Sequence, residues 1–272
     1  PYKGILTFVK VDSERVILSA KQKALRINLN QDLYGTFAEN GAGQEVVRQF
    51  FRAGGASGTI AKAISAYDKG FSDAIYGEEK KGRYVCRTRL DKMLKHEYQL
   101  IEDRLNQEDH PNRQYFAFAN TVTTINFHKT SQGHGWFGVK FQTKAGHPPS
   151  EVLLHARLDE SDVLLQQMTT GILGTNLLYG CFFFYKTPLE LLKSIYDNLD
   201  RSRVEIDMIQ MNGPDFKNVD NRLLSLQLVK NGMTEAVIFS PDGKKLIFRS
   251  SRPKTDADIK KYKFVIFFMC FK

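Results

Sequence analysis

The segment Tyr34–Gly77, YGTFAENGAGQEVVRQFFRAGGASGTIAKAISAYDKGFSDAIYG, contains two glycine clusters that each precede apolar residues at helical spacing. The clusters are Gly41-Ala42-Gly43 and Gly54-Gly55-Ala56-Ser57-Gly58. Glycine permits positive φ angles and lets the backbone approach a ligand closely. The start of a helix presents free N–H groups and the positive end of its dipole, which favour an anion. The segment therefore predicts a phosphate or carboxylate site.

The second cluster is the stronger candidate for an anion cradle. The pattern predicts a helix from Thr59 to about Tyr67, so that backbone N–H groups, two hydroxyls and the Lys62 ammonium converge on a phosphate. Walker A spacing is absent, because no GK[ST] follows the glycines. The alternative is a tight corner between two helices, where glycine serves packing. The predicted ligand-binding residues are Gly54, Gly55, Ser57, Gly58, Thr59 and Lys62.

The loop Glu39–Glu45 could form a second wall at the same face, with Gln44 or Glu45 bound to a ribose hydroxyl. The alternative is a capping turn in which Glu45 favours the helix dipole. Neither loop has GxGxxG spacing after a strand, which argues against a Rossmann dinucleotide site.

His134-Gly135-Trp136 places the single tryptophan beside a histidine between glycines. We expect His134 to be catalytic and Trp136 to line the pocket and stack on a base. An ordinary turn with a core tryptophan is the alternative. His155, within the strand-like VLLHARL, is interpreted as a core histidine.

Asp207 is the best candidate for an acid or base, because ligands in α/β sheets lie beyond the ends of strands. Asp215, in the loop Asn212-Gly213-Pro214-Asp215, is a second catalytic candidate. Together with Asp220 it could hold Mg²⁺ beside a nucleotide, which is the cofactor we expect. The alternative for Asp220 is the cap of the following helix.

The spacing of apolar residues predicts a mixed α/β protein in which α+β is the alternative class. We expect a glycine-rich, mainly helical part at 1–110, a sheet part at 111–245 and a basic, aromatic tail at 246–272. The first two could form one domain. The predicted helices are 44–53, 59–67, 90–105, one through 166–168, 188–199 and 221–231. The predicted strands are 16–18, 24–29, 115–123, 136–143, 152–158, 181–185, 204–211 and 236–239.

Charge and cysteine content narrow the class of protein. More than half of the net charge of +9 lies in residues 246–272, so a general nucleic-acid surface is weakly supported. Three widely spaced cysteines indicate a reducing compartment rather than a disulfide framework. Val163–Tyr185 lacks charge but is rich in Gln, Thr and Gly, which favours a buried segment over a membrane span. The chain opens without a signal peptide, and we expect a cytoplasmic protein.

Several long motifs resemble a bacterial family whose members are commonly labelled nicotinate-nucleotide adenylyltransferase. They are ALRINLNQDLYGTFAENGAGQEVVRQFF, GGASGTIAKAISAYDKGFSDAIYG, HGWFGVKFQT, GILGTNLLYGCFFFY, VEIDMIQMNGPDF and VDNRLLSLQLVKNGMTEAVIF. The resemblance implies nucleotidyl or phosphoryl transfer. The HxGH-type motif of nucleotidylyltransferases is absent from the sequence. After Lys245 the family continues into a further region, so the chain is expected to be a truncated form.

These observations support binding of a phosphorylated small molecule, in the first place a nucleotide, with nucleotidyl or phosphoryl transfer as the reaction. The alternative is a structural or assembly subunit, which could be a homo-oligomer. Nucleic-acid binding through the tail is the weakest hypothesis. The enzyme hypothesis requires both glycine loops and the 212–215 loop to meet in one cleft, whereas the structural hypothesis places them apart with buried glycines.

Overall fold

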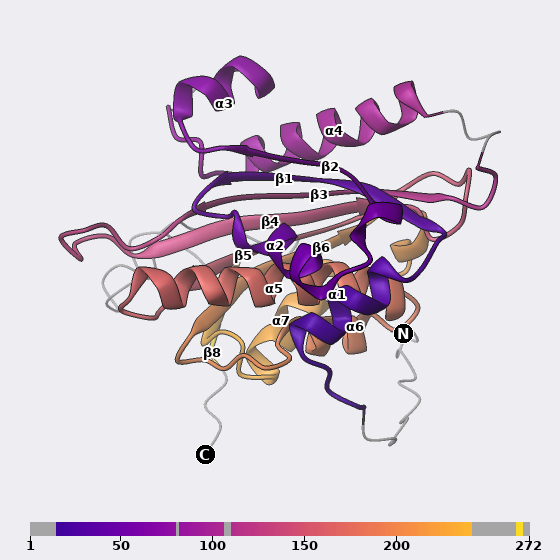
Figure 1. Cartoon of the computed structure of the whole chain (residues 1–272). Coiled ribbons are helices and arrows are strands. Elements are labelled where there is room, and N and C mark those ends of the chain that lie inside the picture. The colour runs from indigo at the N-terminus through magenta and orange to yellow at the C-terminus, as the bar shows by residue number, and fades with distance from the viewer. Residues whose placement is uncertain (1–14, 80–81, 106–109, 241–264, 269–272) are drawn as a thin grey trace, which may run out of the picture.

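The computed structural model describes residues 15–79, 82–105, 110–240 and 265–268. Its centre is a six-stranded sheet in the order β2-β1-β3-β4-β5-β6 (Figure 1). Strand β1 runs parallel to β2 and β3, and every later neighbour is antiparallel. The strands are β1 Leu33–Gly41, β2 Ile60–Ala66, β3 Gln114–Thr123, β4 Gly133–Phe141, β5 Ser150–Leu158 and β6 Val204–Asn212. Strands β7 Ala236–Phe239 and β8 Val265–Phe268 form a separate antiparallel pair.

Helices cover both faces of this sheet, so the mixed α/β class is confirmed. Among the described residues, five helices lie on one side of the sheet and two on the other, and Figure 1 shows these two layers. The first group comprises α1 Ala20–Asn28, α2 Glu45–Ala53, α5 Val163–Phe183, α6 Pro188–Ile195 and α7 Asn221–Lys230. The second comprises α3 Lys69–Tyr76 and α4 Arg87–Arg104. Short 3-10 turns occupy Ala56–Gly58 and Pro214–Phe216.

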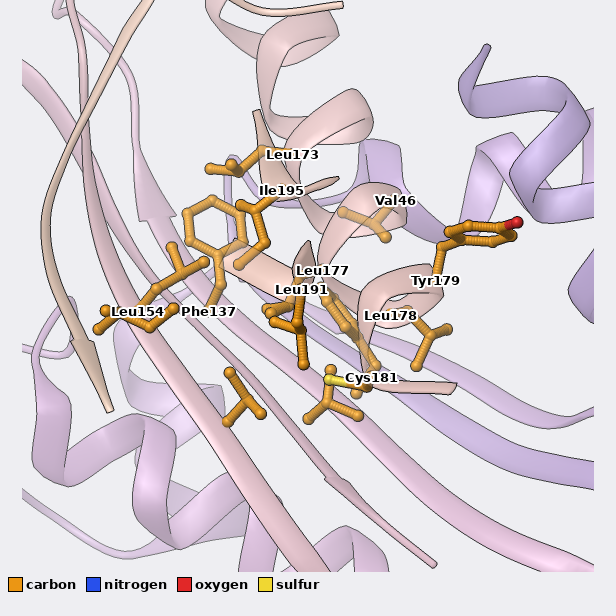
Figure 2. Close-up of a cluster of buried hydrophobic side chains, with 14 of the residues drawn as sticks. Val46, Phe137, Leu154, Leu173, Leu177, Leu178, Tyr179, Cys181, Leu191 and Ile195 are labelled. Carbon is orange, nitrogen blue, oxygen red and sulfur yellow. The ribbon is translucent and has the colours of Figure 1, made fainter. Parts of the chain in front are cut away.

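The two cores follow from the two-residue period of the strands. In β3, Phe116 and Phe118 face the five-helix side, and Ala117 and Ala119 face α4. Figure 2 shows the larger core, where Phe137 and Leu154 of the sheet lie among side chains of α5 and α6. Small alanines on the opposite face let α4 approach the sheet closely.

The uncharged segment forms one buried helix, α5. Asp162 caps it by accepting a hydrogen bond from the Leu165 N–H at 3.0 Å. The strand predicted at Cys181–Tyr185 is wrong, because the helix continues to Phe183. Its polar residues are buried with partners: Asn176 donates to the Ile195 and Asp197 carbonyl oxygens. Within the described ranges, no helix combines the length and apolar character that crossing a bilayer requires.

The N-terminal part contains the main corrections to the expected elements. The strand predicted at 24–29 is wrong, because Ser19 and Gln22 form a capping box that begins α1. The helix predicted at 59–67 is also wrong and is strand β2. Ile60 and Ile64 lie four residues apart, a spacing that suits one face of either a regular helix or a regular strand, although the register shift at Ala61 turns Ile60 to the larger core and Ile64 to the smaller one. Pairing with β1 decides in favour of the strand.

The remaining predicted helices and strands within the described residues are confirmed to within a few residues, apart from the short strand at 16–18, which does not form. The sheet joins the two predicted parts, since β1 pairs with β3 along nine residues across the expected boundary. Residues 241–245 and most of the tail at 246–272 lie outside the described residues.

Gly174 of α5 tests the packing of the larger core. A Cβ there would lie 2.4 Å from Val46 Cγ2 and 3.0 Å from Phe118 Cζ. Helix propensity alone would make Gly174→Ala stabilising by up to about 1 kcal/mol. We expect overpacking to prevail, so that Gly174→Ala lowers the free energy of unfolding by about 1–3 kcal/mol in urea denaturation.

Gly58→Ala is the matched control, because a Cβ at Gly58 meets nothing within 4 Å. We expect this variant to be neutral or stabilised by less than about 1 kcal/mol. A Gly174→Ala variant as stable as Gly58→Ala would contradict the close approach of α2 and α5.

Candidate functional site

Three side chains from neighbouring strands form a continuous polar chain on the α4 side of the sheet. His134 Nδ1 lies 3.2 Å from His155 Nε2, and His155 Nδ1 lies 2.6 Å from Asp207 Oδ1. The residues come from β4, β5 and β6 respectively. The chain thus joins a carboxylate to two imidazoles in series.

A bulge in β6 aims the carboxylate. His155 pairs with Met208 and Ala156 pairs with Ile206, so that Asp207 is the extra residue between them. A bulge redirects a side chain out of the regular alternation and is frequent beside functional sites. Here it brings Asp207 within reach of both His155 and Arg157.

Arg157 holds the other carboxylate oxygen. Its Nε donates to Asp207 Oδ2 at 2.8 Å and lies 4.0 Å from Glu205 Oε2. Glu205 is buried and accepts a hydrogen bond from Thr234 at 2.6 Å, and Arg201 approaches it to 3.3 Å. Asp207 and Glu205 thus both have cationic or hydroxyl partners, and these contacts hold the Asp207 carboxylate in place on the side away from His155.

The histidines open into a pocket of about 420 Å³ where α4 begins. Of the described residues that line it, none is acidic and two are arginines. Arg83 is exposed, and Arg87 is half-buried with its Nε 3.6 Å from Asp91. The lining comprises Arg83, Val85, Cys86, Arg87, Thr88, His134, Trp136 and His155. The pocket therefore has a cationic rim over a histidine-lined floor.

Glycine and threonine residues of the sheet place α4 against this floor. A Cβ at Gly138 would lie 2.7 Å from Leu94 Cδ1, so glycine at this position leaves room for the leucine side chains of the helix. Thr121 donates to the Tyr84 carbonyl oxygen at 2.8 Å, which ties the segment before α4 to β3. Cys86 is the N-cap residue of α4 and makes no side-chain capping hydrogen bond.

Trp136 is 3% exposed and packs on His155, with ring centroids 4.9 Å apart. It lies in the pocket wall, as expected, but its ring is largely covered. Little of the Trp136 ring is accessible to a ligand. Base stacking on Trp136 stays a prediction.

Burial lowers the pKa of His134 to about 4, with further contributions from the neighbouring His155 and Arg157. A buried imidazole loses hydration that would stabilise its charged form. His134 is therefore neutral at pH 7, and the two arginines of the pocket lining carry a permanent positive charge.

When both imidazoles are neutral, the hydrogen-bond chain assigns their protons to particular ring nitrogens. An aspartate carboxylate only accepts, so His155 donates from Nδ1. In neutral His155 the Nε2 lone pair then accepts, and His134 must donate from Nδ1. The Nε2 of neutral His134 is left with a lone pair, which makes it a base.

The glycine corner predicted as an anion cradle lies at the opposite end of the sheet. Gly54 and Gly55 have positive φ, and a strand rather than a helix follows Thr59. Lys62 forms an ion pair of 2.5 Å with buried Glu97. The helix start on which the cradle depended is therefore absent, although Gly58 lines a second pocket of about 480 Å³ with Asn28, Gln31, Asp32 and residues 110–113.

The Glu39–Glu45 loop serves the start of α2. Glu39 Oε1 accepts from the Val46 and Val47 N–H groups at 3.0 and 3.4 Å, and burial raises its pKa to about 8. Asn120 donates to the Gly43 carbonyl oxygen at 2.9 Å. Gln44 donates to Gly41, and Glu45 pairs with Arg48, so the capping alternative describes this loop.

The aspartates predicted as Mg²⁺ ligands are engaged locally. Asp215 accepts hydrogen bonds from Thr143 at 2.8 Å and Ser150 at 2.5 Å. Asp220 caps α7 and pairs with Arg222 at 2.7 Å. Among the residues with a described position, no group of three His, Cys, Asp or Glu side chains could hold a metal ion. The Mg²⁺ hypothesis stays a prediction.

The three loops that the enzyme hypothesis required do not meet in one cleft. The 54–58 and 212–215 loops lie at the same end of the sheet, where β1 begins and β6 ends, but at its opposite edges. Strands β1, β3, β4 and β5 separate β2 from β6. The structure instead brings together His134, Trp136 and Asp207. The sequence analysis did not identify His155, Arg83 or Arg87 as site residues. His155 could have been indicated only by the register of β4 and β5, which pairs it with Trp136.

No family model matches the chain, and no curated protein matches it in sequence. Among solved structures, it is similar to the competence/damage-inducible protein CihA from Agrobacterium tumefaciens, at 16% identity and a TM-score of 0.34, over 53% of this chain and 82% of that one. Two competence-damaged protein (CinA) superfamily proteins also match. The one from Klebsiella pneumoniae has 10% identity and a TM-score of 0.43, covering 59% of this chain and 93% of that one. The one from Enterobacter cloacae has 12% identity and a TM-score of 0.40, covering 63% and 96%. Likenesses at this level carry no argument about function.

Proposed function

We propose that the pocket at the start of α4 binds a phosphorylated small molecule, in the first place a nucleotide, and that His134 acts on it as a general base. The observation that carries the proposal is the Asp207–His155–His134 chain, which ends in a pocket whose rim holds two arginines. Arginine binds phosphate oxygens through paired N–H donors, and the uncapped start of α4 adds its positive dipole end. The motif resemblance to a family labelled as nucleotidyltransferases supports the same substrate class.

The reaction that fits this geometry is nucleotidyl or phosphoryl transfer. A hydroxyl oxygen bound beside His134 Nε2 would lose its proton to that nitrogen as it attacks phosphorus. The departing oxygen takes the electron pair of the P–O bond that breaks, and the arginines would stabilise the charge on the phosphoryl oxygens. His155 and Asp207 are positioning residues, because they orient the His134 ring, and the Asp207 carboxylate favours the proton that His134 gains.

A thermal-shift panel with an arginine variant tests the ligand class. It would compare ATP, nicotinate mononucleotide, nicotinamide mononucleotide, NAD and inorganic phosphate, each with and without Mg²⁺. A ligand at 100 times its Kd should stabilise the protein by roughly 2.7 kcal/mol. Arg83→Ala removes charge-assisted hydrogen bonds, so we expect at least about tenfold weaker binding and a shift reduced by about half.

Arg52→Ala is the matched control, since Arg52 is an exposed arginine next to the glycine corner. It should keep the full shift. Loss of the shift in Arg52→Ala but not in Arg83→Ala would move the site to the glycine corner. Absence of a shift with every compound would overturn the proposal.

The pH dependence of stability tests whether His134 is held neutral. Its pKa falls from 6.5 in the unfolded chain to about 4 in the folded state. As the pH falls through this window, the unfolded chain binds the proton first, so stability is lost. Between pH 7 and 4.5 we expect the wild type to lose roughly 1–3 kcal/mol more unfolding free energy than His134→Asn, in urea titrations at each pH. Equal slopes would contradict the buried neutral imidazole.

A further inference from the structure

The 212–215 loop takes no part in the proposed histidine site, but it contains one of the three Asn-Gly pairs of the sequence. In such a pair the backbone nitrogen of glycine can attack the carboxamide of asparagine, because glycine has no side chain to hinder the approach. The other two pairs are Asn40-Gly41 and Asn231-Gly232. The fold protects these two and leaves the pair Asn212-Gly213 open.

Burial and hydrogen bonds protect two of the pairs. Asn40 is 1% exposed and lies in β1, which pairs with strands on both sides. At the end of α7, Asn231 Nδ2 donates to the Gln227 carbonyl oxygen at 2.7 Å, and the Gly232 N–H donates to the Val229 carbonyl oxygen at 3.0 Å. In Asn231-Gly232, both the amide that would leave and the nitrogen that would attack are therefore held in hydrogen bonds.

The pair Asn212-Gly213 lies at the end of β6, and both of its residues are exposed. The Met211 N–H and carbonyl oxygen turn to the outer edge of the strand, where they bond to Asn221 at 2.8 and 3.1 Å. Strand residues two apart present their backbone groups to the same edge, so the Gly213 N–H also faces outward. None of the described residues accepts a hydrogen bond from it. The attacking nitrogen is thus open to solvent.

Asn221 also activates the carboxamide under attack. Its Nδ2, which donates to the Met211 carbonyl oxygen, lies 3.5 Å from Asn212 Oδ1. That oxygen gains negative charge when a nitrogen adds to Cγ, and a donor held beside it stabilises the charge. Asn212 pairs with Glu151 in the last pair between β5 and β6. Opening of this terminal pair alone frees the Asn212 backbone for ring closure, and strand ends open at a low cost in free energy.

We propose that Asn212 is a site of spontaneous covalent modification, at which the carboxamide is converted to a carboxylate. The Gly213 nitrogen gives its proton to a base in solution and forms a bond to Asn212 Cγ. The Cγ–Nδ2 bond breaks, and its nitrogen leaves as ammonia after it takes a proton from water. Water then adds to either carbonyl of the resulting succinimide and opens the ring to aspartate or isoaspartate.

Peptide mapping by mass spectrometry tests the proposal on the full chain, sampled during incubation at neutral and at mildly alkaline pH. We expect Asn212 to gain about one dalton and form isoaspartate at least tenfold faster than Asn231 or Asn40, because their reactions need a costlier local opening first. The rate at Asn212 should rise with pH, since the attacking nitrogen must lose its proton. In urea the three pairs should react at similar rates, because the folded structure no longer distinguishes them.

Asn212→Gln is the matched control, because the longer side chain would have to close a six-membered ring, which forms far more slowly. Its peptide should keep its mass while Asn231 behaves as in the wild type. Equal rates at Asn212 and Asn231 in the folded chain would overturn the proposal, and so would a ratio of rates that urea leaves unchanged. A mass gain that persists in Asn212→Gln would place the reaction at another residue and overturn the proposal as well.

Discussion

The hydrogen bond between Asp207 and His155 is the constraint on which the candidate site depends. Val204 and Ile206 face the larger core, so Asp207 lies on the α4 side, and the β6 bulge places it beside Met208 opposite His155. The hydrogen bond also sets the tautomer of His155 and, through it, that of His134. The carboxylate at the β6 bulge thereby holds two histidines in series, and His134, at the end of this chain, lines the pocket.

The site exists because helices cover the two faces of the sheet to different extents. Five helices cover one face with large apolar side chains, whereas α4 covers only part of the other. Gly138 lets α4 lie close to the strands, and the uncovered remainder at its first turn becomes the pocket. Burial in this pocket keeps His134 neutral, so its imidazole is available as a base. The two arginines at the rim provide the positive charge for an anionic ligand.

Much of the fold could be predicted from the sequence, because alternation in β3, β5 and β6 and helical stripes in α2 and α4 have strong periods. The failures have physical causes. The Ile60/Ile64 spacing fits a helix and a strand equally, and α1 depends on a capping box that apolar spacing does not reveal. His134, Trp136 and Asp207 were found one by one as residue types, but their grouping needs strand register. His155 was interpreted as a core histidine because it lies within the strand-like VLLHARL. It is indeed buried, but burial alone does not show its hydrogen-bonded role.

The most direct test of the account is a ¹⁵N–¹H NMR titration of the histidine side chains in the full chain, with His134 and His155 assigned by substitution. The account predicts that His134 carries its proton on Nδ1 at pH 7 and gains a second proton only near pH 4. His155 should show Nδ1–H with Nε2 as the acceptor. A His134 with the proton on Nε2, or one that titrates near pH 6.5, would contradict the carboxylate–imidazole–imidazole chain as the source of a base in this pocket.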